Sequence, residues 1–460
     1  MSSPTNNPQS PASAVTSPKG SKSPTPGPAS PVTVRESSVV PKSKSPTPAP
    51  TPTPGPVSPA ATREPSAAPK SPTPAPVTET TADATGLLPG AHWAGQNLPE
   101  EDTDNDWDST LGTEIESSTA SISSSILQYR TINGRTYHSE SVANTPYWGP
   151  NDEKQNELLD IFHHTMTIAL DGDLYKAPIT ENPKNVLDIG TGTGLWAIDF
   201  ADKFPQCSVI GTDLSPIQPS WVPANIRFDI DDYNKEWTYK ADFFDLIHMR
   251  WITGTVNNWH TLYKEAYRCC KPGGWIEHLD CSGAIWSDDG TVEEDMAIGQ
   301  WGKIWQEAGR RLGTPFDILE KNTQEEGMRG AGFVNISKTT YPKYDHPTEV
   351  HSHTRASSPS ETCVSKTTMM LINQNQTIQI PMSPWSKEKK WKEVGIYFNA
   401  VVNQDLEGAT QFLFGNIMGW TKEEITQYIA VMKREVKNLN IHGYMPYRLV
   451  YAQKPLNAED

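Results

Sequence analysis

A regular pattern of hydrophobic and polar residues, made of helical spacings and short apolar runs, starts only at about residue 123 of this chain. In residues 151–170, Leu158, Phe162 and Met166 recur at four-residue spacing, which predicts an amphipathic helix. Short apolar runs then alternate with helical stretches, as in a parallel sheet covered by helices on both faces. The strand candidates are residues 186–189, 209–212, 226–230, 244–249 and 274–279, with helices at 196–203 and 262–269.

The regular alternation stops near residue 281, and helical periodicity dominates the rest of the chain. We predict helices at residues 296–312, 386–400 and 421–438, and strands at 332–341 and 444–452. Trp301 and Trp305 lie four residues apart, a spacing that favours core packing over a cofactor site. Thr421 and Glu424 form a capping box at the start of the last helix.

Composition separates the first 120 residues from the remainder. Of the 40 prolines, 22 precede residue 90, whereas all 15 tryptophans lie at Trp93 or later. Frequent proline removes backbone donors and fixes φ, which favours an extended, unfolded chain. We therefore expect residues 1–120 to be a disordered Pro/Ser/Thr-rich tail with an acidic linker, and residues 121–455 to form the folded domain.

Charge and cysteine content exclude several classes of protein. The net charge of −16 does not favour broad attraction to nucleic-acid phosphates or to anionic membranes. The five cysteines fit neither a disulfide framework nor a CxxC zinc site, and we predict no metal site. No apolar run approaches the ~18 residues that span a bilayer, and the N-terminus lacks a signal-peptide pattern. We expect an intracellular protein, cytoplasmic or nuclear.

The candidate chemistry begins where an apolar strand runs into three glycines at alternate positions, Gly190, Gly192 and Gly194. Glycine permits a sharp turn and a close approach of the backbone to a ligand. A dinucleotide site needs G-x-G-x-x-G, and its third glycine would fall at Leu195, so a nicotinamide oxidoreductase is disfavoured. Asp188, two residues before the first glycine, would repel a pyrophosphate and attract a cationic ligand group.

Acidic residues end the next two strand candidates. Asp213 occupies the position where α/β nucleotide sites hold two ribose hydroxyls, and a carboxylate can accept both. Asp232, followed by Tyr233, can offer an acceptor to an adenine amino group. Taken singly, each acid is better explained as a solvated loop residue. Three acids at consecutive strand ends around one glycine loop favour a nucleoside site.

These residues resemble the class I S-adenosylmethionine-dependent methyltransferases, on the glycine loop, Asp213, residues 244–245 and residues 270–274. Longer segments resemble the LaeA-like family of fungal methyltransferases: residues 133–138, 150–153, 213–223, 230–232, 247–250, 271–275 and 453–455. The resemblance covers about residues 123–341 and 378–455. It implies an α/β, Rossmann-like, seven-stranded sheet whose last strand is antiparallel, with a helical cap over the cofactor.

The resemblance also implies roles for the cofactor residues. The methionine end of S-adenosyl-L-methionine would lie against Asp188, Gly190, Gly192 and Gly194, although Asp188 has a competing role in ordering the glycine turn. Asp213 would hold the ribose, and Asp232 with Tyr233 would meet the adenine edge.

Candidates for catalysis follow from the fourth and fifth strands. His248 and Arg250 end the fourth strand, where an acceptor and the sulfonium would meet. A general base is needed only if the acceptor arrives protonated, and His248 and Glu277 are weak candidates for it. Glu277 and His278 are adjacent on one strand, so at most one of them faces the site. For Tyr137, Tyr147 and Trp275 two roles are left open: packing within the cap, or contact with a ligand in the site.

Two functions of different class follow. One is an active methyltransferase that acts on an unidentified acceptor, a small metabolite or a protein, with a link to fungal secondary metabolism. The other is a nuclear regulatory subunit that acts through protein partners with little or no catalysis. The complete glycine loop and the strand-end acids favour the enzyme, because a scaffold has no need of them.

Residues 342–377 depart from the family pattern, because they lack helical or strand period and are rich in Ser, Thr, His and Asn. In relatives the sixth strand runs almost directly into the segment corresponding to residues 380–385. A structureless loop of this length is uncommon inside a compact domain. It is either a surface excursion or the translation of an unspliced intron, and the clean return of the pattern at residue 380 favours the intron.

Overall fold

The computed structural model describes residues 81–96, 125–139, 141, 147–339 and 377–457, all of which belong to the compact unit formed by residues 76–460. The proline-rich tail up to residue 80, most of the acidic linker and nearly all of the insertion predicted at 342–377 lie outside the described residues.

A mixed sheet forms the centre of this unit. Its parallel strands are β5 (Ile226–Ile230), β4 (Ser208–Asp213), β3 (Asn185–Ile189), β6 (Phe244–Arg250) and β7 (Cys270–Cys281), in that spatial order. Next to β7 lies β10 (Tyr444–Gln453), antiparallel to β7, and then β8 (Val334–Lys338). The predicted seven-stranded arrangement with an antiparallel last strand is confirmed. A short additional strand, β9 (Ile378–Pro381), also pairs with β10.

Helices cover both faces of the sheet, as the alternation predicts. Val186 packs with Trp196 of α3 (Leu195–Lys203) on one face. Its neighbour Leu187 packs with Leu262 of α4 (Trp259–Cys269) on the other. The second face is also covered by α6 (Thr323–Ala331), which contributes Met328. Successive strand side chains point to opposite faces, so a run of consecutive apolar residues needs a helical layer on each face.

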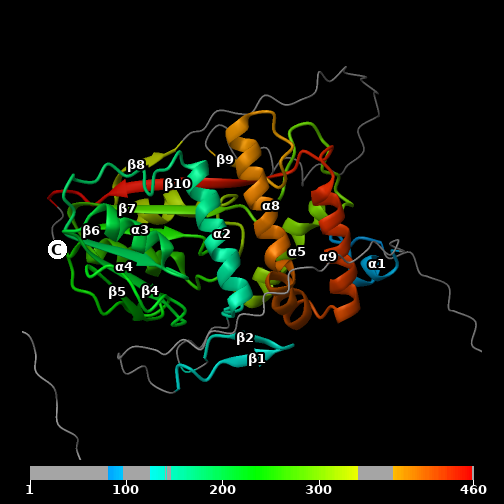
Figure 1. Ribbon diagram of the computed structural model, residues 1–460, viewed down its shortest axis with the longest axis horizontal. Helices are drawn as coiled ribbons and strands as arrows, with labels where there is room; N and C mark the ends of the chain where they lie inside the picture. Colours follow the sequence, from blue (N-terminus) through cyan, green and yellow to red (C-terminus); the bar gives the residue numbers. More distant parts are fainter. Residues whose placement is uncertain (1–80, 97–124, 140, 142–146, 340–376, 458–460) are drawn as a thin grey trace, which may run out of the picture. The chain divides into compact units, whose positions relative to one another are not determined.

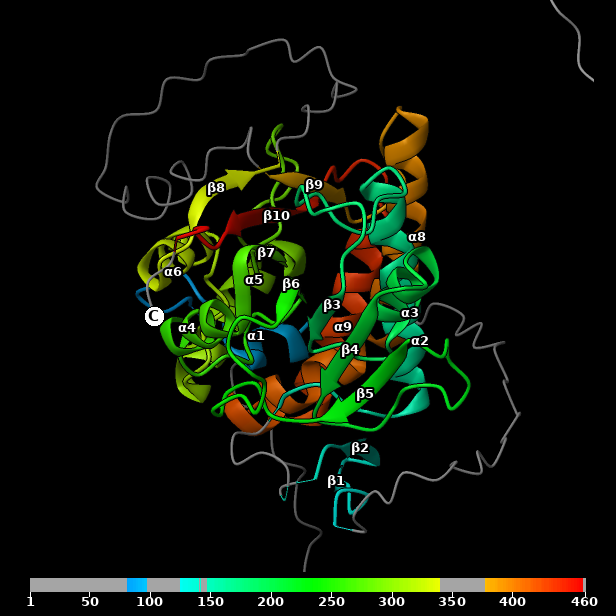
Figure 2. The ribbon, with the colours of Figure 1, turned by 90° about the vertical axis from the view of Figure 1, so that its left-hand side faces the viewer.

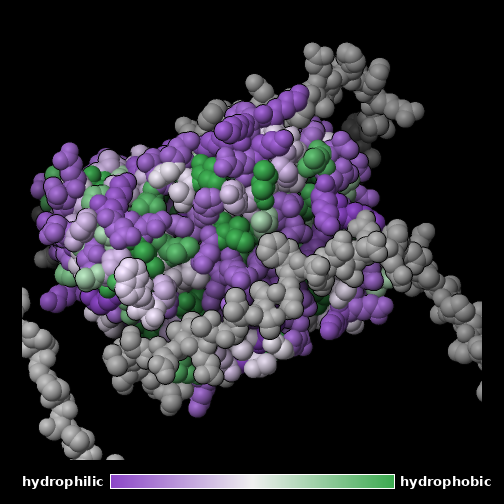
Figure 3. Space-filling view, in the orientation of Figure 1, coloured by the Kyte–Doolittle hydropathy of each residue, from purple (hydrophilic) through white to green (hydrophobic). Residues whose placement is uncertain are grey.

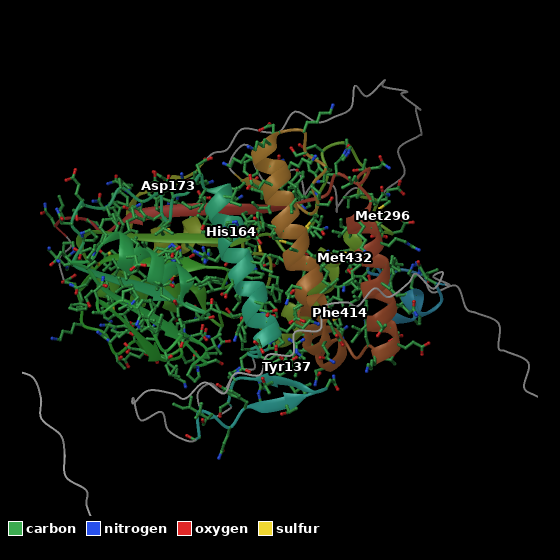
Figure 4. The ribbon with its side chains drawn as sticks, viewed as in Figure 1. Tyr137, His164, Asp173, Met296, Phe414 and Met432 are labelled. Atoms are coloured by element: carbon green, nitrogen blue, oxygen red, sulfur yellow. The ribbon has the colours of Figure 1, made fainter. Side chains whose placement is uncertain are left out.

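A second group of helices packs beside the sheet and forms the cap. It contains α2 (Glu153–Ala169), α5 (Ala297–Leu312), α8 (Lys389–Thr410), the π-helical segment η2 (Gln411–Ile417) and α9 (Lys422–Lys437), which share one apolar core. Figures 1 and 2 show α2 running beside α8. Figure 4 locates Phe414 and Met432 among these helices, and Tyr137 at the hairpin of β1 (Arg130–Ile132) and β2 (Arg135–Tyr137).

The visible surface of this unit is predominantly polar. Figure 3 shows hydrophobic residues in small separate areas between hydrophilic ones on the face in view. None of the described helices is long and apolar enough to cross a lipid bilayer.

A short helix, α1 (Gly90–Ala94), lies within the range that the sequence assigned to the tail. Trp93 is fully buried, and its ring meets Tyr428 of α9 edge-on at 5.0 Å between centroids. The backbone N–H of Leu88 donates to Gln300 Oε1 at 2.9 Å. The expectation that all of residues 1–120 lie outside the fold is therefore revised. The sequence did not predict that Trp93 packs into the core, because the residues around it carry no helical period.

Strands β8 and β9 occupy consecutive stretches of the same edge of β10, as Figure 2 shows. Lys338 lies opposite Val450, and the Thr339 N–H donates to the Leu449 carbonyl at 3.1 Å. The pairing resumes with Ile378 opposite Tyr447, which leaves one position on β10 for Thr377. Residues 340–376 are thus inserted into one strand without any shift of its register.

We predict that deleting residues 340–376 preserves the fold, because Thr339 then joins Thr377 in a continuous antiparallel ladder with β10. The midpoint of thermal unfolding should change by less than ~3 °C. Deleting residues 340–377 is the matched control. Removing that one further residue turns the side chains of β9 to the opposite face and should lower the midpoint clearly. Equal unfolding of both variants would contradict the register argument, and sequencing the transcript tests the intron independently.

A second prediction concerns the N-terminal anchor. Truncation before residue 81 should leave the free energy of unfolding unchanged, whereas Trp93→Ala should lower it by about 3 kcal/mol, because a buried aromatic side chain is removed. Chemical denaturation of both variants measures the difference. An unchanged stability of Trp93→Ala would remove α1 from the core.

Candidate active site

A cleft opens at the carboxyl ends of β3, β4, β5 and β6, where the sheet meets α2. In a parallel sheet these strand ends share one edge, so residues far apart in sequence converge there. Of the predicted cofactor residues, the lining includes Asp188, Gly190, Gly192, Asp213 and Tyr233. Gly194 and Asp232 do not line it.

The glycine loop turns at the end of β3 through left-handed backbone conformations. Gly190 and Gly192 have φ values of 65° and 59°, which side chains with a Cβ rarely adopt. Gly194 is also left-handed, with φ 85°, but it is the N-cap of α3, and a Cβ there would lie 2.5 Å from the Phe228 ring. Two of the three glycines therefore shape the cleft, and the third permits close packing behind it.

Asp213 joins the glycine loop to the end of β4. Its Oδ2 accepts the Gly192 N–H at 2.8 Å, and its Oδ1 accepts the Ser215 N–H at 3.0 Å. Burial raises the pKa of Asp213 to about 6, although these N–H groups oppose the shift. A carboxylate has about four acceptor positions, so it retains capacity for ligand hydroxyls.

The structure places His248 beneath the cleft and not in its lining. The ring is 2 % exposed and stacks on Trp196 with 3.7 Å between centroids. Burial lowers the pKa of His248, so a neutral ring donates from Nδ1 to Asp188 Oδ1 at 2.7 Å. Asp188 Oδ2 accepts the Thr191 hydroxyl at 2.6 Å. His248 thus orients Asp188, which in turn orders the glycine turn.

Glu277, the other candidate base, also lies away from the cleft. Its Oε2 accepts the N–H groups of Lys176 and Ala177 at 2.8 and 2.7 Å. Burial raises its pKa to about 7, but its side chain is 1 % exposed and anchors the loop before β3. Neither residue lines the cleft, and both strands continue beyond these positions.

The end of β5 brings Tyr233 to the cleft and turns Asp232 aside. The Asp232 Oδ1 accepts the Asn234 N–H at 3.0 Å, and its Oδ2 lies 3.5 Å from Lys235 Nζ. The Tyr233 hydroxyl lies 2.6 Å from Thr255 Oγ1, and both side chains line the cleft. Asp232 therefore shapes the turn that presents the Tyr233 ring.

Arg250 supplies a cation to the lining of the cleft. Its guanidinium donates to His163 Nδ1 at 3.0 Å, which makes His163 Nε2 the donor to Asp199 Oδ2 at 2.9 Å. Burial lowers the pKa of Arg250. No carboxylate within the described part of the chain lies at ion-pair distance from this guanidinium, so it can meet an anionic ligand group.

The roof of the cleft contains functional candidates that sequence reasoning did not single out. Asn151 and Gln155 line it and are 7 % and 5 % exposed. Asn151 Oδ1 and Gln155 Oε1 have no hydrogen-bond partner among the described residues. Tyr147 also lines the cleft, whereas Tyr137 packs against Phe412 and Trp275 against Tyr451. The family-like segment 150–153 includes Asn151, whereas no sequence pattern marked Gln155.

Within the described ranges, no group of three or more His, Cys, Asp or Glu side chains is arranged to hold a metal ion.

Comparison with known proteins agrees with this architecture. Residues 162–338 match the family model of a methyltransferase domain. The chain is 33 % identical to the methyltransferase pytC of Aspergillus terreus over 347 residues, which cover 74 % of this chain and 93 % of that protein.

Two further relatives bear names of different kinds. The secondary metabolism regulator laeA of Aspergillus fumigatus is 32 % identical over 70 % of this chain and 76 % of its own length. The protein-methionine methyltransferase laeA of Emericella nidulans is 30 % identical over 72 % of this chain and 77 % of its own.

A parallel sheet with an antiparallel last strand, a glycine loop at the carboxyl edge and this degree of identity lead to one conclusion. The chain belongs to the LaeA-like family of fungal class I S-adenosylmethionine-dependent methyltransferases.

Proposed function

We propose that this cleft binds S-adenosyl-L-methionine and that the chain transfers the methyl group to an acceptor held under the cap. The chemistry of the lining supports the fit. Two carboxylates, Asp188 and Asp213, suit a cationic methionine end and a ribose, and Arg250 suits a carboxylate. The carrying observation is Asp213, a half-buried carboxylate whose N–H partners fix it at the mouth of the glycine loop.

Each residue has a defined task in this proposal. Asp188 and the loop of Gly190 and Gly192 face the amino end, and Arg250 holds the carboxylate through the relay from Asp199 and His163. Asp213 accepts the ribose hydroxyls, and the Tyr233 ring packs on the adenine. Gly194 and Asp232 do not contact the cofactor in this proposal. Gly194 allows α3 to pack closely, and Asp232 stabilises the turn after β5.

S-adenosyl-L-methionine, when bound, supplies an electrophilic methyl group on a sulfonium. The chain's own contribution is to orient the acceptor and to exclude water, since methyl transfer depends on alignment more than on covalent help. His248 is a positioning residue that holds Asp188, and Glu277 has a structural role. A protonated acceptor would therefore have to lose its proton to solvent or to a group other than these two.

A regulatory role is the second candidate, and the names of the laeA relatives favour it. In that case protein partners in the nucleus would use the cap surface, and cofactor binding would set the state of the cap. Binding of S-adenosylhomocysteine without turnover on any acceptor would favour this second role.

We expect Asp213→Ala to weaken S-adenosylhomocysteine binding by about 2–4 kcal/mol, because ribose hydroxyls lose a charged acceptor. Isothermal titration calorimetry gives the affinity, and thermal unfolding checks that the variant folds. Asp202→Ala is the control, since Asp202 is an exposed acid on α3 away from the cleft. Unchanged affinity in folded Asp213→Ala would remove the residue from the site.

The affinity should also depend on pH in a direction set by Asp213. Its raised pKa, about 6, means that the carboxyl is charged above that pH and protonated below it. Ligand hydroxyls favour the anion, so the affinity should be complete above about pH 7 and fall by up to about tenfold per pH unit below 6. In Asp213→Asn the affinity should be weaker at pH 8 and nearly constant from pH 5 to 8. A wild-type affinity that rises on acidification would contradict this assignment.

A further inference from the structure

A second cavity, which we call the apolar chamber, adjoins the cofactor cleft under the cap. It lies between α5, α8 and β10, and it shares Trp148, Gln155 and Trp251 with the cleft. Trp148 meets Trp305 edge-on with 5.0 Å between centroids, and Trp305 meets Phe316 at 4.9 Å. Met432, labelled in Figure 4, contributes to the lining from α9. The walls are therefore mainly aromatic and aliphatic.

The chamber offers no uncompensated charge to a ligand. Its lining contains no Lys or Arg side chain. The one carboxylate in it, Asp405, is fully buried and receives the Arg135 guanidinium at 2.8 and 2.6 Å. An ionic ligand would thus have to leave water without gaining a partner, which is unfavourable.

Several polar atoms around the chamber nevertheless lack partners. Trp148 Nε1, Gln155 Oε1, Thr253 Oγ1 and Trp305 Nε1 are buried and make no hydrogen bond within the described part of the chain, and all four residues line the chamber. Unpaired buried polar groups are rare in folded proteins and call for an explanation. The two indoles can only donate, whereas the Gln155 oxygen can only accept.

From these observations we propose that the apolar chamber binds the methyl acceptor, and that the acceptor is a neutral aromatic small molecule carrying a hydroxyl. A hydroxyl both accepts and donates, so it can satisfy an indole N–H and the Gln155 oxygen together. The cavity volume is about 100 Å³, of the order of the ~150 Å³ apolar cavity that takes up benzene. The chamber thus accommodates about one aromatic ring.

The inference rests on the proposed function, because it assigns the acceptor to the cavity that adjoins the cofactor cleft. Gln155 stands where the two cavities meet, so an acceptor hydroxyl bound to it faces the methyl donor. The same geometry disfavours charged acceptors: benzoate would bring an anion, and benzylammonium a cation, into a lining without a free counter-charge.

The test uses the full chain saturated with S-adenosylhomocysteine and four probes: phenol, benzene, benzoate and benzylamine. Ligand-observed NMR titration should give phenol the tightest binding, at least about tenfold tighter than either charged probe. Ala409→Leu fills the chamber from α8, and should weaken phenol binding about tenfold. Ala400→Leu is the matched control on the same helix, half-buried but outside the lining, and should leave phenol binding unchanged.

Calorimetry with S-adenosylhomocysteine separates the two levels of the argument. If the wild type does not bind it, the proposed function fails. If S-adenosylhomocysteine binds equally to the wild type and to both variants, the proposed cofactor site is supported. The phenol titrations then test whether the chamber binds the acceptor. Preference for a charged probe, equal binding of benzene and phenol, or an Ala409→Leu variant that binds phenol like the wild type would overturn the inference. Retained phenol selectivity with loss in Ala409→Leu alone would support it.

Discussion

The ion pairs of Arg135 with Asp152 and Asp405 hold together the two helices that border the cleft and the chamber. Its guanidinium binds Asp152, the N-cap of α2, at 2.5 and 2.7 Å, and Asp405 within α8 at 2.8 and 2.6 Å. Burial by itself would lower the pKa of Arg135, but the two carboxylates raise it above its ordinary value. Asp405 is fully buried, and its other cationic partner, Lys154 Nζ, lies 3.6 Å away. Loss of Arg135 would therefore leave a buried charge with one longer ion pair, which is destabilising.

The backbone of α8 is adapted to this ion pair. Asp405 departs from helical geometry, with φ −148° and ψ 49°, and a Cβ on Gly408 would lie 2.1 Å from Asp405 Oδ2 and 2.7 Å from Arg135. The hairpin therefore reaches into the helix only because residue 408 has no side chain. The result joins α2, the roof of the cleft, to α8, a wall of the chamber. Charge is concentrated at the sheet edge and neutralised beside the chamber, which suits a charged cofactor and a neutral acceptor.

The sequence predicted the sheet and the cofactor edge because both depend on local patterns. Alternating strands, the glycine loop and Asp213 occupy short windows, and parallel topology brings their ends together. His248 shows where this reasoning stops. His248 and Arg250 are two residues apart and point to the same face, yet only Arg250 lines the cleft. Depth along the strand separates them, and residue type at a strand end carries no information on depth.

The ion pair and the anchor were not predictable for a different reason. Arg135 and Asp405 are 270 residues apart, and each looks like an ordinary surface charge in its own segment. Trp93 follows a proline-rich tail and precedes an acidic linker, and the few apolar residues beside it, such as Leu87 and Leu88, form no helical period. The position of Glu277 away from the cleft was equally unpredictable, because its partners are backbone N–H groups of a loop a hundred residues earlier. Contacts of this kind are set by tertiary packing, which propensity and periodicity do not encode.

The edge strand formed by β8 and β9 explains how the fold tolerates 37 residues between Thr339 and Thr377. The two ends of the inserted segment are held side by side by β10, so the sheet itself brings them together. Loop closure then costs only a term that grows with the logarithm of length, whereas a change of register would turn every side chain of β9 to the wrong face. Ile378 and Ile380 are fully buried, so the apolar core fixes the register of β9 after the insertion. An insertion at this point is therefore constrained in where it returns and almost unconstrained in how long it is.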